Sequence, residues 1–139
     1  MPKFFPIAIE PDIEAAQSDL LEFHWNISAI RATFMIPQRP DHALEVSFAD
    51  QCIVRLVDEM PLSTEVDDSS NEGAVSNHFA YRVEGALFFR AQSEAFKTVV
   101  KLRHGSCKHY RFVTGWTCLD VVTGAEPCFT VVPRAKNSN

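Results

Sequence analysis

A run of basic residues in the second half of the sequence is the feature with the clearest chemical meaning. No acidic residue lies between Glu94 and Asp120, and this interval holds five of the thirteen Lys and Arg residues of the chain. Arginine binds carboxylate or phosphate through two parallel hydrogen bonds, and lysine acts as a point charge. The run therefore indicates a surface for an acidic partner or an anionic ligand. Its basic residues are Lys97, Lys101, Arg103, Lys108 and Arg111, and His104 and His109 lie among them.

A β-hairpin would bring these side chains to one face. From Phe96 to Arg103 apolar and basic residues alternate, which favours a strand. The basic end of this stretch and the Gly105 that follows it would also suit a helix over residues 96–104. We predict the strand, with a three-residue loop at 105–107 that turns the chain back into a second strand.

Like charges face one another in this predicted hairpin. Arg103 lies opposite His109, and Lys101 lies opposite Arg111. Opposed like charges destabilise a sheet, so a negative group should lie over this face. Three sources remain open: the chain's own acidic loop or solvent, an acidic partner protein or second copy, and a small anionic ligand or nucleic acid. The net charge of −5 argues against nucleic acid. The predicted binding residues are Lys97, Lys101, Arg103, His109 and Arg111.

A cysteine inside the basic run suggests a competing, enzymatic function. Cations around Cys107 would lower the pKa of its thiol and favour the nucleophilic thiolate. His104 or His109 would act as the base, and Asp120 would orient the histidine. The alternative is an inert cysteine in a turn. We favour a non-catalytic binding module and keep the small enzyme as its rival.

The same residues are too few for a metal centre. His104, Cys107 and His109 lie within six residues, but zinc needs three or four converging ligands and the neighbouring cations oppose it. The stretch 67–78 begins like a calcium loop, yet Glu72 replaces the required Gly and His78 the required Glu. We therefore predict no metal and no cofactor. No CxxC motif occurs, so the four cysteines are expected to be reduced.

The elements that must position these residues are mostly strands. The length of 139 residues fits a single domain over 1–139. We predict an α+β, mainly β fold: one antiparallel, strongly twisted sheet, or a partly closed barrel or sandwich, of about eight short strands joined by hairpin-like turns. One helix is expected from Pro11 to Glu22. The expected strands cover 23–36 (one long or two short), 44–48, 52–57, 79–83, 86–90, 96–103, 108–114, 116–122 and 128–132.

Two segments are expected to lie outside the packed domain. Residues 58–76 form an acidic loop, since Asp58 to Gly73 holds six acidic residues and no basic one. Residues 134–139 form a polar, frayed tail.

Composition also bears on location and assembly. No apolar stretch reaches the roughly 20 residues that span a bilayer, and the apolar start is too short and too acidic for a signal peptide. The sequence therefore predicts a soluble cytoplasmic protein without membrane contact. Exposed sheet edges make a structural subunit of a homo-oligomer the third interpretation of function.

Overall fold

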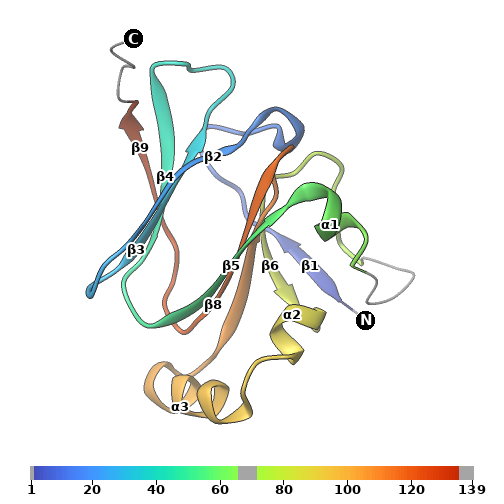
Figure 1. Ribbon diagram of the computed structural model, residues 1–139, viewed down its shortest axis with the longest axis vertical. Helices are drawn as coiled ribbons and strands as arrows, with labels where there is room; N and C mark the ends of the chain where they lie inside the picture. The colour runs from blue at the N-terminus through green and yellow to red at the C-terminus, as the bar shows by residue number, and fades with distance from the viewer. Residues whose placement is uncertain (1, 66–71, 135–139) are drawn as a thin grey trace.

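The computed structural model describes residues 2–65 and 72–134 as two packed antiparallel sheets (Figure 1). The first sheet has the strand order β1-β6-β7-β8-β5, and the second has the order β2-β3-β4-β9. The mainly β prediction is confirmed, but the strands form two sheets rather than one. The strands are β1 (Lys3–Pro6), β2 (Leu20–Trp25), β3 (Ile30–Met35), β4 (His42–Phe48), β5 (Cys52–Asp58), β6 (Ala80–Glu84), β7 (Lys108–Phe112), β8 (Thr117–Thr123) and β9 (Cys128–Pro133).

Several helical segments replace the one helix that was predicted. They are a 3₁₀ turn η1 (Ala15–Gln17) and the helices α1 (Glu59–Ser63), α2 (Leu87–Arg90) and α3 (Glu94–His104). The predicted helix at 11–22 is wrong, because only η1 is helical there and Leu20 already begins β2. The predicted strand at 86–90 is wrong too, since α2 occupies it. The acidic segment 58–76 contains α1, and its residues 66–71 lie outside the described residues, as does the tail 135–139.

Helix α3 overturns the predicted basic hairpin. Its first turn is capped by Ser93, whose Oγ accepts a hydrogen bond from the N–H of Phe96 at 3.3 Å. Its end is closed by Gly105, which adopts φ 85° and donates its N–H to the carbonyl of Lys101 at 2.8 Å. Caps at both ends therefore outweigh the β-propensity of Thr98 to Val100, and β7 pairs with β6 and β8 instead.

Two expected hairpins are in fact crossings between the sheets. β4 lies in the second sheet and β5 in the first, and β8 and β9 are separated in the same way. Alternating apolar residues mark the inner face of a strand in either sheet, so the pattern cannot say to which sheet a strand belongs. The segment 23–36 does form two short strands, β2 and β3, as one of the two alternatives held.

Aromatic rings fill the space between the sheets. Phe34 packs edge-on against Phe79 with ring centroids 4.8 Å apart, and Phe112 lies 5.7 Å from Phe79. Side chains alternate along a strand, so the inward Tyr110 and Phe112 of β7 leave His109 and Arg111 on its opposite face. α2 lies over that opposite face, since the Phe88 ring centroid is 5.7 Å from that of His109, and Arg111 lines a cavity together with Glu59 and Leu62 of α1.

One side of the sandwich is formed by two edge strands, β5 and β2. On β5, Val54 and Leu56 pair with the buried Val121 and Leu119, so they share the inward face. Phe23 on β2 is paired with the buried Ala32 and is also inward. Apolar side chains therefore reach solvent along this side. Within the described residues, no helix has the length and apolar character needed to cross a membrane.

Candidate functional site

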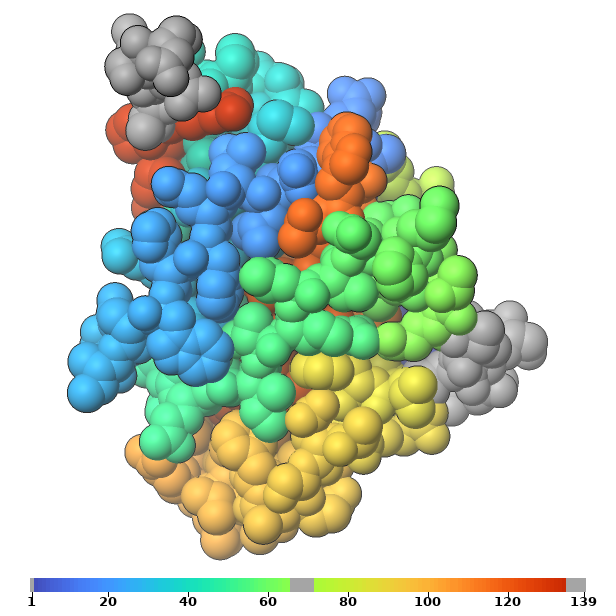
Figure 2. Space-filling view, viewed as in Figure 1, coloured from blue at the N-terminus to red at the C-terminus, as the bar shows by residue number. Residues whose placement is uncertain are grey.

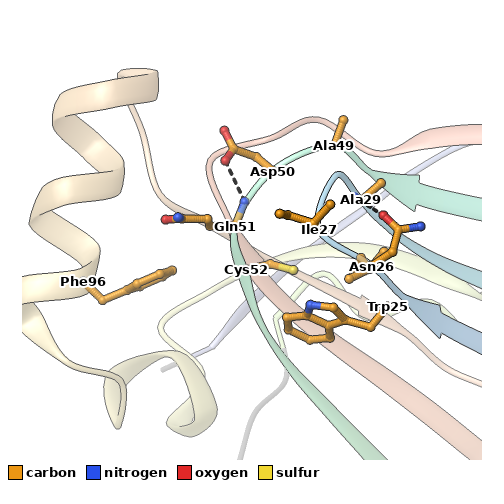
Figure 3. A pocket seen from close by; sticks show the side chains of 10 residues that line it. Trp25, Asn26, Ile27, Ala29, Ala49, Asp50, Gln51, Cys52 and Phe96 are labelled. Atoms are coloured by element: carbon orange, nitrogen blue, oxygen red, sulfur yellow. Dashed lines mark hydrogen bonds between the residues drawn. The ribbon is translucent and has the colours of Figure 1, made fainter.

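A cleft of about 470 Å³ opens where the two edge strands meet α3 (Figure 3). We call it the hairpin–helix cleft. One wall is the β2–β3 hairpin, the base is the crossing from β4 to β5, and Phe96 projects from α3 toward it (Figure 3). Its lining residues are Trp25, Asn26, Ile27, Ala29, Ile30, Ala49, Asp50, Gln51, Cys52 and Phe96.

The hairpin wall is rigid in its backbone and apolar at its tip. The Oδ1 atom of Asn26 accepts hydrogen bonds from the backbone N–H groups of Ser28 at 2.9 Å and Ala29 at 3.1 Å. This fixed turn leaves Ile27 fully exposed and Trp25 58% exposed. Large apolar side chains held outward next to one another are typical of an interaction surface.

The helix wall presents both apolar and basic side chains. Phe96, Val99 and Arg103 recur at the spacing i, i+3, i+7 and therefore share one side of α3. Ala95, Val99 and Leu102 form an exposed stripe next to that side, and Leu102 is 82% exposed. The apolar surface of the cleft thus continues onto the helix.

A contact between the side chains of His104 and Asp50 fastens this helix to the base of the cleft. His104 Nε2 lies 2.5 Å from Asp50 Oδ2. The N–H of Gln51, together with His104 and Arg103, lowers the pKa of Asp50. Gly124 gives the imidazole room, because a Cβ there would come within 2.6 Å of the His104 ring. The end of α3 is therefore fixed relative to the strands that form the cleft.

The chemistry of the cleft suits binding rather than covalent catalysis. Burial and the nearby Asp50 carboxylate raise the pKa of the Cys52 thiol to about 11, so the sulfur is protonated at neutral pH. The side-chain oxygens of Asn26 and Asp50 already serve the turn and the contact with His104. A ligand would therefore meet the apolar side chains of Trp25, Ile27 and Phe96 together with the side-chain amide of Gln51.

The residues predicted to form one cationic face are divided between two places. Lys101 and Arg103 are exposed on α3. Lys97 is mostly buried, pairs with Glu94 at 2.8 Å and lies 4.8 Å from the centre of the Phe89 ring. His109 and Arg111 are buried in β7. The common face over a hairpin does not form, because the first of its strands is a helix.

The buried pair belongs instead to a charge cluster around Asp120. Asp120 Oδ1 accepts hydrogen bonds from His109 Nε2 at 2.6 Å and Arg111 Nε at 2.8 Å. Its Oδ2 accepts two more from Arg55, at 3.0 and 2.7 Å, and Arg55 also holds Glu65 at 2.6 Å. We call these five residues the Asp120 cluster.

Protonation within the Asp120 cluster follows from its charges. Burial opposes ionisation of Asp120, but the hydrogen bonds from His109 and Arg111 hold its pKa well below the ordinary value. Burial lowers the pKa of His109, more than Asp120 can raise it. A neutral His109 leaves two arginines balanced by two carboxylates. The cluster is thus an internally neutralised structural unit.

The apolar neighbours of Asp120 in the sequence point to this cluster, although the prediction from the charge pattern did not take them into account. Asp120 lies within the apolar run from Cys118 to Val122, where a lone carboxylate must be buried with partners. Sequence reasoning assigned Asp120 only to orienting a histidine near Cys107. It missed Arg55 and Glu65, which come from distant parts of the chain.

The positions of Cys107, His104 and His109 bear on the hypothesis that Cys107 is a catalytic nucleophile. Cys107 and His109 both line a second cavity, of about 370 Å³. Burial raises the pKa of the Cys107 thiol and Lys97 offsets this only in part, so the predicted lowering is wrong. His109 Nε2 is already engaged with Asp120, and His104 is paired with Asp50 in the other cleft.

Metal binding and disulfide formation are two further kinds of chemistry that the His, Cys, Asp and Glu side chains could support. Within residues 2–65 and 72–134, no group of three or more His, Cys, Asp or Glu side chains converges as a metal site would require. The cysteines at 52, 107, 118 and 128 are free thiols.

No family model matches the chain, and the searches of curated proteins and of solved structures gave no significant match.

Proposed function

We propose that this protein is a non-catalytic recognition module whose hairpin–helix cleft binds an apolar peptide segment flanked by acidic residues. The observation that carries the proposal is the exposure of Trp25 and Ile27 on a fixed turn, across a cleft from Phe96. The segment would belong to a partner protein. A cytoplasmic location remains part of the proposal.

The apolar residues supply the affinity in this account. Covering an exposed isoleucine or tryptophan gains about 1.5–3 kcal/mol per side chain. Tryptophan is also among the residues that dominate binding energy at protein interfaces. The stripe on α3, with Val99 and Leu102, extends the area that a bound segment can cover.

Arg103 of α3 supplies the preference for acidic flanks. It is exposed and shares the side of the helix that carries Phe96 and Val99, whereas the exposed Lys101 lies on the opposite side. This keeps the acidic partner that the sequence predicts, but it assigns the contact to α3 alone. Lys97, His109 and Arg111 have no part in it, since their side chains are engaged or buried. Binding through exposed charges should weaken as salt is added.

Selection from a displayed random peptide library tests this proposal without knowledge of the natural partner. The wild-type protein should enrich peptides with a large apolar residue next to Asp or Glu. The double variant Ile27→Ser/Leu102→Ser should lose those peptides, because it removes apolar surface from the hairpin wall and from the adjoining stripe on α3. Val75→Ser is the matched control, since Val75 is also exposed but lines a different cavity. Enriched peptides that bind the double variant as well as the wild type would refute the proposal.

A further inference from the structure

The edges of the two sheets differ in how they are protected from pairing with another strand. In the described part of the chain the edge strands are β1, β5, β2 and β9. Proteins protect such edges with proline, with a bulge or with a covering segment. β1 contains Pro6 and β9 contains Pro133, and β2 has a register shift between Leu20 and Glu22.

β5 is the edge strand that lacks these protections. It pairs with β8 without a register shift from Cys52 to Asp58, and it contains no proline or lysine. Apart from the ladder with β8, no hydrogen bond among the described residues engages the backbone of residues 53–57. Figure 2 shows β5, in green, at the surface between the β2–β3 hairpin, in blue, and α2, in yellow. The outer edge of β5 is therefore a row of unpaired N–H and C=O groups, which is the complement of another strand.

The inward side chains beside this edge are apolar and incompletely covered. Val54 is half-buried and Leu56 is 47% exposed on the inward face of β5. Phe23, on the inward face of the other edge strand β2, is half-buried too. A strand added to β5 would direct every second side chain toward this gap between the sheets. Apolar residues at alternate positions of that strand would extend the core.

The edge of β5 begins in the hairpin–helix cleft. Cys52, the first residue of β5, lines the cleft together with Trp25, the last residue of β2 (Figure 3). A single extended segment can therefore fill the cleft and continue along β5. The seven residues of β5 extend roughly 20 Å.

We propose that the recognised peptide binds in an extended conformation and adds to the outer edge of β5 as a further strand of the first sheet. This inference rests on the proposed function, because it assigns the conformation and the side-chain pattern of the segment that the cleft binds. The backbone of the peptide exchanges hydrogen bonds with β5, and its alternate apolar side chains cover Val54 and Leu56. The acidic residues next to them point away from the core. A helical peptide cannot make these backbone bonds, since its own turns use them.

Methylation of the peptide backbone tests this arrangement on the wild-type protein. Each backbone N–H of a peptide from the library selection is methylated in turn, and binding is measured by calorimetry. In a bound strand, alternate residues direct their N–H and C=O groups to the neighbouring strand. Methylation at every second position should therefore weaken binding by about tenfold, because a hydrogen bond is lost there. Methylation at the positions between them should leave binding unchanged.

A charge on the inward face of β5 provides a second test. Leu56→Asp places a carboxylate where the added strand must bury apolar side chains, so binding should weaken by about tenfold or more. Val75→Asp is the matched control, because Val75 is similarly exposed, at 52%, but lines a different cavity. Circular dichroism checks that both variants are folded. The methylation series decides the question if Leu56→Asp does not fold.

The outcomes separate this inference from the proposed function. Peptides that lose affinity for Ile27→Ser/Leu102→Ser but show no alternation in the methylation series overturn the added strand and leave the recognition module standing. Full binding to a folded Leu56→Asp variant would also overturn it. A library that yields no acidic apolar peptide overturns both proposals.

Discussion

Replacing Asp120 with asparagine should destabilise the protein severely, because the carboxylate is the centre of the Asp120 cluster. Asp120 is fully buried and accepts four hydrogen bonds, from His109, Arg111 and Arg55. Asp120→Asn keeps the shape but removes the charge, and it turns an amide N–H toward donors. Arg111 is then a buried cation whose remaining carboxylate neighbour is Glu65, at 3.7 Å.

The size of the effect can be worked from these contacts. Breaking a buried ion pair by removing one partner costs about 3–5 kcal/mol. Arg55 keeps Glu65, which stays partly exposed, so the lower half of that range is expected. For a domain of this length, 1 kcal/mol shifts the melting temperature by about 3–5 °C, so the melting temperature should fall by roughly 10–20 °C.

Urea unfolding followed by circular dichroism measures this directly. Glu126→Gln is the matched control: Glu126 pairs with Lys108 at 2.6 Å, but its side chain is mostly exposed. Loss of an exposed pair should cost no more than about 1 kcal/mol. A cost for Asp120→Asn that equals the control would mean that the Asp120 cluster does not stabilise the fold as a set of charges.

Three further predictions follow from the geometry. His109 is neutral in the fold because its pKa is lowered, whereas in the unfolded chain it takes up a proton near pH 6.5. The free energy of unfolding should therefore fall as the pH drops below about 6.5. A free energy that stays constant from pH 7 to 5 would contradict the buried neutral imidazole. Gly105→Ala should lower the free energy of unfolding by about 1 kcal/mol, because Gly105 adopts a φ of 85°, although no neighbouring atom obstructs a Cβ there. An unchanged melting temperature would show that the helix cap is not left-handed. A maleimide should modify the exposed Cys128 well before Cys52, because the pKa of the half-buried Cys52 thiol is raised to about 11. Mass spectrometry of the digested peptides measures the two rates. Equal rates of modification would refute the protonated Cys52 thiol in the cleft.

Local patterns predicted most of the strands, because alternation of apolar residues reports burial of one strand face. Leu44, Val46 and Phe48 alternate in this way and do form β4. The same pattern cannot distinguish a hairpin from a crossing, since both sheets turn apolar faces to one core. The division into two sheets therefore could not be read from the sequence.

The position of the candidate site depended on one ambiguous segment. Residues 96–103 alternate like a strand, but Ser93 and Gly105 supply the caps of a helix. Had the caps been given more weight than Thr98 to Val100, the basic residues would have been placed on a helix. The exposure of Trp25 and Ile27 could not be read from the sequence, because an apolar residue on a strand is more often expected to face the core.

The hairpin–helix cleft can be tested most directly through the fluorescence of Trp25. The chain has two tryptophans, so Trp116→Phe leaves Trp25 as the only one. Titrating this variant with an acidic apolar peptide from the library selection should shift the emission of Trp25 to shorter wavelength and saturate, and the shift should be lost when Ile27→Ser/Leu102→Ser is added. Peptide binding that saturates without any change in Trp25 emission would contradict the assignment of the cleft as the recognition site.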